Sequence, residues 1–192
     1  NITGNEERLF LCECYDYKQK EIIQSPLNYT GGKYKLLPQI LPHFPQDIDR
    51  FVDLFCGGGN VGINVPCNRV VFNDNNELLR YMFGTFKNLD KQVTFETIDA
   101  IIEKYGLSNT EKYGYDFYGC NSAEGLAAYN SSRYLKLRDD FNHHTNLEYN
   151  YYVTLYVLIV YAFNNQIRFN RKGEFNLPVG KRDFNKKMRE KL

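Results

Sequence analysis

The chain has 192 residues, a formal net charge of +1, 43% hydrophobic residues and 24% charged residues, which is typical of a globular protein with a hydrophobic core. No apolar run reaches the roughly 18 residues of a transmembrane helix, and no secretory signal peptide is present. We therefore expect a cytoplasmic protein that does not associate with a membrane.

Charge is distributed unevenly along the chain. Residues 163–192 hold nine Lys or Arg and three Asp or Glu, a local charge of +6, which leaves −5 for all preceding residues. A basic segment on a mildly acidic body is typical of a protein that binds a polyanion. By charge alone, a solvated and partly disordered terminus is the simpler interpretation.

The cysteines suggest neither a disulfide framework nor a metal site. Five occur, at positions 12, 14, 56, 67 and 120. The number is odd, and the C-x-C pair at 12 and 14 would need two further ligands that the sequence does not offer. We therefore expect reduced thiols and no bound metal.

The first third of the chain predicts an α/β arrangement. Residues 8–15 predict a short strand, and a polar connector and a turn-rich loop follow up to residue 33. Leu36, Leu37, Ile40 and Leu41 recur at helical spacing before two prolines. Residues 51–55 then predict a buried strand, and Cys-Gly-Gly-Gly-Asn at 56–60 a tight loop.

A second strand, a helix and a less regular region follow the glycine loop. Residues 70–73 predict the strand, with Asp74 at its end, and residues 77–89 a helix. A strand, a glycine loop, a second strand and an acid in this order are typical of the start of a nucleotide-binding domain. Helical patterning recurs around residues 95–102, and a Tyr- and Gly-rich loop covers 113–120.

The last third predicts two helices and a β-hairpin. Residues 124–141 place apolar side chains on one helical face, and residues 149–163 form a strongly apolar helix. Residues 163–180 form two alternating runs around Asn-Arg-Lys-Gly, which predicts a hairpin.

The glycine loop and Asp74 fit a cofactor that has an adenosine half. Glycines let the backbone approach such a ligand closely, and an acid 15 residues after Gly59 could accept hydrogen bonds from both ribose hydroxyls. The spacing from Gly59 to Asp74 is long enough for one loop, a short helix and a strand. A turn that only packs the sheet, with Asp74 as a helix N-cap, is an equally good account of these residues alone. No P-loop motif is present.

Three segments in order resemble the Dam-type, or D12-class, DNA adenine-N6 methyltransferases. The first is Tyr-Thr-Gly-Gly-Lys at 29–33, and the second is the strand and glycine loop at 51–59 with Asn73-Asp74 after it. The third runs from Phe163 to Gly180 and matches the long family signature F-N-x-x-x-R-x-N-x-x-G-x-F-N-x-P-x-G. Such a run is too long to arise easily by chance. The resemblance implies a Rossmann-like methyltransferase sheet, incomplete here, with a helical and β-hairpin target-recognition insert.

The resemblance also implies a pocket for S-adenosylmethionine. Tyr29 would lie against the cofactor, Lys33 would pair with its carboxylate, and Asp74 would hold its ribose. Asp53 would support its ammonium group. The glycine loop would supply backbone through Gly57 and Gly59.

The resemblance further implies that the hairpin reads double-stranded DNA. A two-stranded ribbon fits the major groove, and Arg168 is the residue that we expect to donate two hydrogen bonds to a guanine, although a phosphate contact is the alternative. The other residues that we expect at DNA are Phe163, Asn164, Gln166, Arg171, Lys172 and Pro178. Among them Phe163 would lie beside the displaced adenine, or simply close the preceding helix, while Arg171 and Lys172 would contact phosphates. Family members that methylate GATC carry Leu where this chain has Gln166, so GATC recognition is not implied.

The family's catalytic motif is absent from these residues. Exocyclic N6 of adenine is a poor nucleophile, and the family uses Asp-Pro-Pro-Tyr to accept its hydrogens and to stack the flipped base. The sequence contains no Pro-Pro pair. Because it starts with Asn1 and ends in a charged stretch, we expect part of a longer bacterial or phage modification enzyme. A missing C-terminal half or second chain would then be its partner.

We predict three parts of different function. Residues 1–24 are an N-terminal extension, residues 25–105 bind the cofactor, and residues 106–192 recognise DNA. Two alternatives remain. A non-catalytic DNA- or cofactor-binding module would lack Asp-Pro-Pro-Tyr in its whole reading frame and in any neighbouring chain. A dinucleotide-dependent oxidoreductase would bind NAD, and it leaves Gly-Gly-Lys and the basic hairpin unexplained.

Overall fold

The computed structural model describes residues 9–13, 21–145 and 149–192. Contacts divide the chain into an N-terminal unit, Asn1–Gly84, and a C-terminal unit, Thr85–Glu190, with Lys191 grouped with the first and Leu192 with the second. The division falls inside helix α2 (Glu77–Asn88). The functional division expected between residues 105 and 106 stays a prediction.

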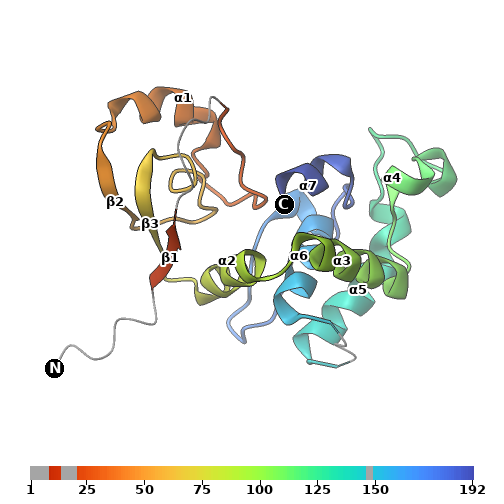
Figure 1. The fold of residues 1–192 in the computed structure, drawn as a ribbon. Helices are drawn as coiled ribbons and strands as arrows, with labels where there is room; N and C mark the ends of the chain where they lie inside the picture. Colours follow the sequence, from red (N-terminus) through yellow and green to blue (C-terminus); the bar gives the residue numbers. More distant parts are fainter. Residues whose placement is uncertain (1–8, 14–20, 146–148) are drawn as a thin grey trace. The chain divides into compact units, whose positions relative to one another are not determined.

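The N-terminal unit contains a small mixed sheet with strand order β1-β3-β2 (Figure 1). Strand β2 (Ile48–Asp53) runs parallel to β3 (Cys67–Asn73), and β1 (Leu9–Glu13) pairs antiparallel with the other edge of β3. The strands predicted around 8–15, 51–55 and 70–73 are therefore confirmed within the described residues, although β2 begins and ends earlier than expected. The prediction that the strand at 51–55 is buried is wrong, because Val52 is 47% exposed, and Leu54 and Phe55, just beyond the strand, are 55% and 84% exposed. The parallel pair is compatible with a methyltransferase fold, and a Rossmann-like arrangement of a complete sheet stays a prediction.

The connection from β2 to β3 differs from the expectation. The short helix expected after the glycine loop is absent from the described residues there, and turns replace it. The amides of Ile63 and Val65 still bond to carbonyls four residues back, at 3.1 Å each. Three glycines at 57–59 precede these turns, and glycine disfavours a helix because its backbone loses most freedom on folding.

The short helix predicted from Leu36 to Leu41 is confirmed but subdivided. A 3-10 turn (η2, Tyr34–Leu36), helix α1 (Leu37–Ile40) and a second 3-10 turn (η3, Leu41–His43) follow one another. Phe44, just before Pro45, is extended, which is the conformation that a following proline favours. Apolar side chains of this segment pack on the sheet core formed by Val65, Cys67, Val70 and Phe72.

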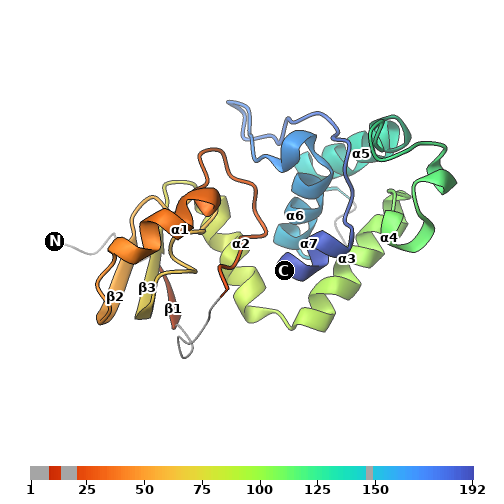
Figure 2. The same ribbon diagram turned by 90° about the horizontal axis from the view of Figure 1, so that it is seen from above.

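The C-terminal unit is a helical bundle built around an apolar helix. Helices α3 (Lys91–Tyr105) and α5 (Ala127–Asn142) both pack against α6 (Tyr151–Tyr161), whose side chains from Val153 onward are all buried (Figures 1 and 2). The helices predicted in these regions are thus confirmed. Shorter elements are α4 (Thr110–Tyr113), η4 (Asp116–Tyr118) and α7 (Lys186–Lys191). Within the ranges described, no helix combines the length and apolarity needed to cross a membrane.

The segment after α6 is a return of the chain, but not the regular β-hairpin that the sequence predicts. A 3-10 turn, η5 (Phe163–Asn165), interrupts its first arm, with Asn164 and Asn165 in left-handed conformation. Only two isolated bridges join the arms, Ala162 to Val179 and Phe169 to Phe175. The two arms therefore return antiparallel around residues 170–173 as predicted, but they do not form a regular ladder, because left-handed residues break the alternation that a ladder needs. Figure 2 shows this segment (165–175) extending away from α6 as a blue loop.

A buried polar network ties the end of this segment to the bundle. The carboxylate of Asp183 accepts hydrogen bonds from the backbone amide of Thr110 (2.7 Å), the Thr110 hydroxyl (2.9 Å) and the Ser108 hydroxyl (3.3 Å). Tyr161 donates to the Ser108 carbonyl oxygen at 2.6 Å, and the Asn130 side chain holds both the amide and the hydroxyl of Ser108. Burial of Asp183 is the largest influence on its pKa and raises it above the usual value, against the lowering effect of these donors.

Asp183 is expected to give stability a measurable pH dependence. A carboxyl group whose pKa is raised in the folded state binds more protons there than in the unfolded chain, so its contribution to stability falls as pH rises from the usual 3.8 through the raised value. In Asp183→Asn this contribution is absent. Urea unfolding of both proteins between pH 4 and pH 7 should give a difference in unfolding free energy that changes with pH. A constant difference would contradict the raised pKa.

Candidate functional site

A cavity of about 310 Å³ lies at the carboxyl end of β2 in the N-terminal unit. It is lined by Tyr29, Thr30, Gly31, Gly32, Lys33, Asp53, Phe55, Cys56, Gly57, Gly58, Asn60, Val61, Asp74 and Asn75. Five of the six residues expected at the cofactor line it, although they come from three separate segments. The sixth, Gly59, does not line it but shapes the loop, with a φ of +76° and an amide that donates to the Cys56 carbonyl at 2.7 Å.

Asp74 is fixed by the backbone on two sides. Its Oδ2 accepts from the amide of Gly57 at 2.9 Å, and its Oδ1 accepts from the amide of Asn76 at 3.0 Å. The first bond ties the end of β3 to the glycine loop after β2. Each carboxylate oxygen keeps a further lone pair, so Asp74 can still accept hydrogen bonds from a ligand in the cavity.

Tyr29 and Gly57 pack so closely that a larger residue at position 57 would require the Tyr29 ring to shift. A Cβ atom at Gly57 would lie 2.7 Å from the Tyr29 ring, and the φ of Gly57 is +49°. The ring thereby forms one wall of the cavity. Burial, followed by the nearby charge of Asp74, raises the pKa of Tyr29, so its hydroxyl stays protonated.

Asp53 holds the turns that follow the glycine loop. Its Oδ2 accepts from the amide of Gly62 at 2.9 Å. Burial, and then the charge of Asp74, raises the pKa of Asp53, although the Gly62 amide opposes this. Two carboxyl groups that repel each other in one cavity favour a cationic group of the ligand.

Lys33 and Cys56 differ in what they offer a ligand. The Lys33 ammonium is exposed and donates to the Gly31 carbonyl at 2.7 Å, so it can still bond to an anion. The Cys56 thiol has its pKa raised to about 12, first by burial and then by Asp53 and Asp74. Because a thiolate is the nucleophilic form of cysteine, the raised pKa disfavours a nucleophilic role for Cys56.

In the C-terminal unit, the Arg168 side chain is held by Asn176 on the other arm of the segment 163–180. Its Nε donates to Oδ1 of Asn176 at 2.8 Å, and its Nη2 donates to the Asn176 carbonyl at 3.0 Å. These bonds use one edge of the guanidinium group. The outer edge, with both hydrogens of Nη1 and one of Nη2, remains for a further partner, and the residue is exposed.

Helix α5 anchors the second arm of the same segment through side chains. Asn142 exchanges two hydrogen bonds with the backbone of Phe175, at 2.8 and 3.0 Å. Tyr134 and Arg138 both donate to the Leu177 carbonyl, at 3.0 and 2.9 Å. The Asn142 side chain thus pairs with the backbone of Phe175 as a neighbouring strand would, so this arm is held without a regular ladder.

The other residues expected at DNA lie on the outside of this segment. Phe163 is 49% exposed. The side chains of Asn164, Arg171, Lys172 and Pro178 are exposed and that of Gln166 is half-buried. The Phe163 amide also donates to the Pro178 carbonyl at 2.9 Å, which closes the base of the return.

The sequence profile of the D12 class N6 adenine-specific DNA methyltransferases matches residues 29–192. The chain belongs to this family. The chain is 39% identical over 175 residues to modification methylase StsI of Streptococcus sanguinis and 38% identical over 178 residues to type II methyltransferase M.FokI of Planomicrobium okeanokoites. It is 30% identical over 155 residues to the DNA adenine methylase of Escherichia coli K12.

The chain covers only part of each D12-class relative. The matches take in 90%, 92% and 81% of this chain, but 23%, 24% and 47% of StsI, M.FokI and the Escherichia coli enzyme. Methyltransferases of this class generally use S-adenosylmethionine and act on DNA. Within the described part of the chain no group of three His, Cys, Asp or Glu could hold a metal ion, so no metal site is found there.

Several residues that shape the N-terminal cavity or hold the segment 163–180 were not predicted from the sequence. Asn60 is buried, and its Oδ1 accepts from the Ser25 amide at 3.0 Å, which fixes the start of the loop that carries Tyr29. Phe55 lines the cavity while 84% exposed. An asparagine directly after three glycines was the one available signal for Asn60. The α5 side chains Asn142 and Arg138 gave none, because their partners lie more than 30 positions away.

Proposed function

We propose that this chain forms the S-adenosylmethionine pocket and the DNA-reading part of an adenine-N6 DNA methyltransferase. The single observation that carries the proposal is that one cavity gathers Tyr29, Lys33, Asp53, Gly57 and Asp74 in a chain of the D12 class. The cavity volume of about 310 Å³ falls at the lower end of small-molecule sites.

The donors and acceptors of the cavity suit each part of this cofactor. Asp74, already oriented by two amides, would accept the ribose hydroxyls. Lys33 would bond to the methionine carboxylate, and Asp53 would face its ammonium group. The Tyr29 ring would lie against the bound molecule, and Gly57 with Gly59 would let the backbone approach it. Once bound, S-adenosylmethionine supplies an electrophilic methyl group.

The segment 163–180 would bind double-stranded DNA in the major groove. We assign Arg168 to a guanine, Gln166 and Pro178 to neighbouring base edges, and Arg171 with Lys172 to phosphates. Phe163 would lie beside the displaced adenine, and Asn164 would also contact the DNA.

Calorimetric titration with S-adenosylhomocysteine tests the pocket. Asp74→Ala removes a charged acceptor, and Lys33→Ala removes a charged donor, so each should weaken binding by about 10- to 100-fold. Lys35→Ala, an exposed lysine in the adjacent turn, is the matched control and should leave binding unchanged. Equal affinity of all four proteins, or binding of NAD in place of S-adenosylhomocysteine, would contradict the proposal.

The 192 residues alone are expected not to methylate DNA, because they contain no Pro-Pro pair and hence no Asp-Pro-Pro-Tyr motif. Incubation with tritiated S-adenosylmethionine and genomic DNA should leave the DNA unlabelled. A D12-class polypeptide that carries the motif, added as positive control, should label the same DNA. Label transfer by the 192 residues would refute the expectation.

A further inference from the structure

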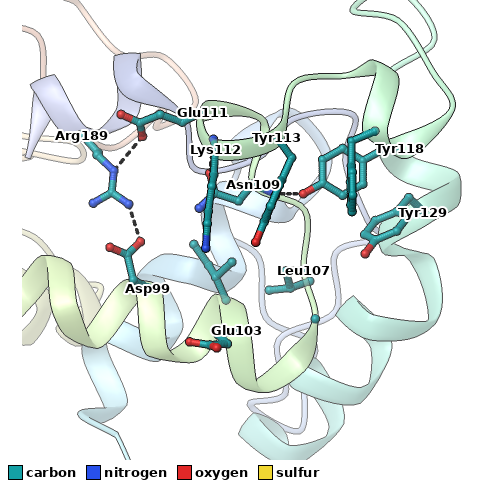
Figure 3. Close-up of a pocket in the computed structure, with 13 residues that line it drawn as sticks. Asp99, Glu103, Leu107, Asn109, Glu111, Lys112, Tyr113, Tyr118, Tyr129 and Arg189 are labelled. Carbon is teal, nitrogen blue, oxygen red and sulfur yellow. Dashed lines mark hydrogen bonds and ion pairs between the residues drawn. The ribbon is translucent and has the colours of Figure 1, made fainter.

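A second and larger cavity, of about 600 Å³, lies entirely within the C-terminal unit (Figure 3). It shares no residue with the proposed cofactor cavity or with the segment 163–180. Its lining comes from α3, from α4 and the turns after it, from α5 and from α7. It consists of Asp99, Ile102, Glu103, Gly106, Leu107, Asn109, Glu111, Lys112, Tyr113, Phe117, Tyr118, Tyr129 and Arg189.

Carboxylates outnumber cationic side chains in the lining of this cavity. The Arg189 guanidinium group pairs with two carboxylates, donating to Asp99 and, at 2.8 Å, to Glu111. Figure 3 shows this bridge at one end of the cavity and Glu103 on the α3 side. Glu103 is exposed and forms no direct ion pair among the residues described. Three carboxylates against two cations give the lining a net charge of −1.

Four aromatic rings also line the cavity, and two of them are strongly exposed. Tyr113 and Phe117 stack with centroids 4.8 Å apart, yet they are 47% and 64% exposed. Tyr118 contacts Phe117 edge-on at 5.0 Å and Tyr129 at 4.5 Å. Exposed rings gathered around a cavity are typical of a binding surface.

The protein's own cations already use these rings. The guanidinium carbon of Arg133 lies 3.9 Å from the centroid of Tyr129, and the ammonium of Lys112 lies 5.0 Å from that of Tyr113. Both positions are within the range of cation–π attraction. The wall therefore favours flat or compact cations over anions.

We propose that this cavity binds the guanidinium group of an arginine on a partner polypeptide. Guanidinium is planar and rich in donors, so it suits both a carboxylate such as Glu103 and an exposed ring such as Phe117 in the same lining. An ammonium group pairs but does not stack in this way. A nucleic-acid phosphate would face three carboxylates.

The proposal makes opposite predictions for two neighbouring charges. Glu103→Gln removes the carboxylate that pairs with the guest and should weaken binding. Lys112→Gln removes a cation that repels the guest and should strengthen it. Each change should be about 2- to 5-fold, as for ion pairs in partly exposed positions. An anionic guest would reverse both signs.

The test uses the whole 192-residue chain and three blocked pentapeptides, Ala-Ala-X-Ala-Ala with X as arginine, lysine or citrulline. Amide NMR signals of Glu103, Tyr113 and Phe117 report binding. The arginine peptide should bind most tightly and the citrulline peptide, which is flat but neutral, least. Phe117→Leu should reduce the preference for arginine over lysine. Glu96→Gln, on α3 but outside the cavity, is the control and should change nothing.

Three results would overturn the proposal. The first is equal binding of the arginine and citrulline peptides, and the second is no shift of these signals at 10 mM peptide. The third is binding of single-stranded oligothymidine to the same signals, weakened by Lys112→Gln, which would assign the cavity to nucleic acid. None of these results bears on the S-adenosylhomocysteine titration, because the two cavities share no residue.

Discussion

Gly180→Ala is expected to lower the free energy of unfolding by about 2–4 kcal/mol. A Cβ atom at position 180 would lie 2.4 Å from the Ala162 carbonyl oxygen and 2.7 Å from its carbon. Both are backbone atoms at the end of the buried helix α6, so neither can rotate away as a side chain would. The Gly180 amide also donates to the Tyr161 carbonyl at 2.7 Å, and displacement of the chain would lengthen this bond.

Thermal unfolding followed by circular dichroism measures this effect. Gly173→Ala at the tip of the same segment is the control, because its Cβ would meet nothing within 4 Å and only its φ of +80° is unfavourable. That strain should cost about 1–2 kcal/mol. Equal melting temperatures for the two variants would show that the backbone around Ala162 can relax, and would contradict the expected clash.

The end of the family signature could be interpreted from sequence alone because its contacts are local. Among its last five positions, Asn176 accepts a hydrogen bond from the Arg168 guanidinium group, and the Pro178 carbonyl accepts one from the Phe163 amide. Gly180 lies where the backbone passes close to that of Ala162. Each of these roles depends on contacts within about 20 residues along the chain. Local sequence therefore contained enough information to predict a chain return at 163–180.

The same sequence could not specify the form of that return. Alternating apolar and polar residues predicted a ribbon, but Asn164 and Asn165 adopt left-handed conformations and no continuous ladder forms. The arm is instead held by Asn142 and two other α5 side chains. An asparagine near the end of an amphipathic helix has many possible partners, so pattern analysis cannot identify this one.

The proposed cofactor cavity illustrates a similar division. The strand ends and glycine positions that bring Asp53, Gly57 and Asp74 together follow from the order of strands and loops. Asn60, which fixes the loop carrying Tyr29, depends on a contact 35 positions away. The cavity in the C-terminal unit was not predicted at all, since its rings come from a Tyr- and Gly-rich stretch that has no clear periodicity.

Arg168→Ala should remove the preference for guanine at one position of the DNA target and leave other positions unchanged. Asn176 holds the inner edge of the guanidinium group through two hydrogen bonds. The outer edge can then donate two parallel bonds to guanine O6 and N7, an arrangement worth about 1–3 kcal/mol of discrimination, or roughly 5- to 150-fold. Asn176→Ala should cause part of the same loss, because the guanidinium group then has to be ordered during binding.

To measure this preference directly, DNA that binds the parent or a variant chain is selected from a randomised duplex library and sequenced. Arg171→Ala is the matched control, an exposed arginine three positions away. If Arg171 contacts a phosphate, its removal should weaken binding to all sequences alike. The slope of log K against log salt concentration should then fall by about one. If Arg168→Ala gave the same uniform loss with an unchanged sequence preference, Arg168 would be a phosphate contact too. Base recognition by this segment would then depend on Gln166 and Pro178.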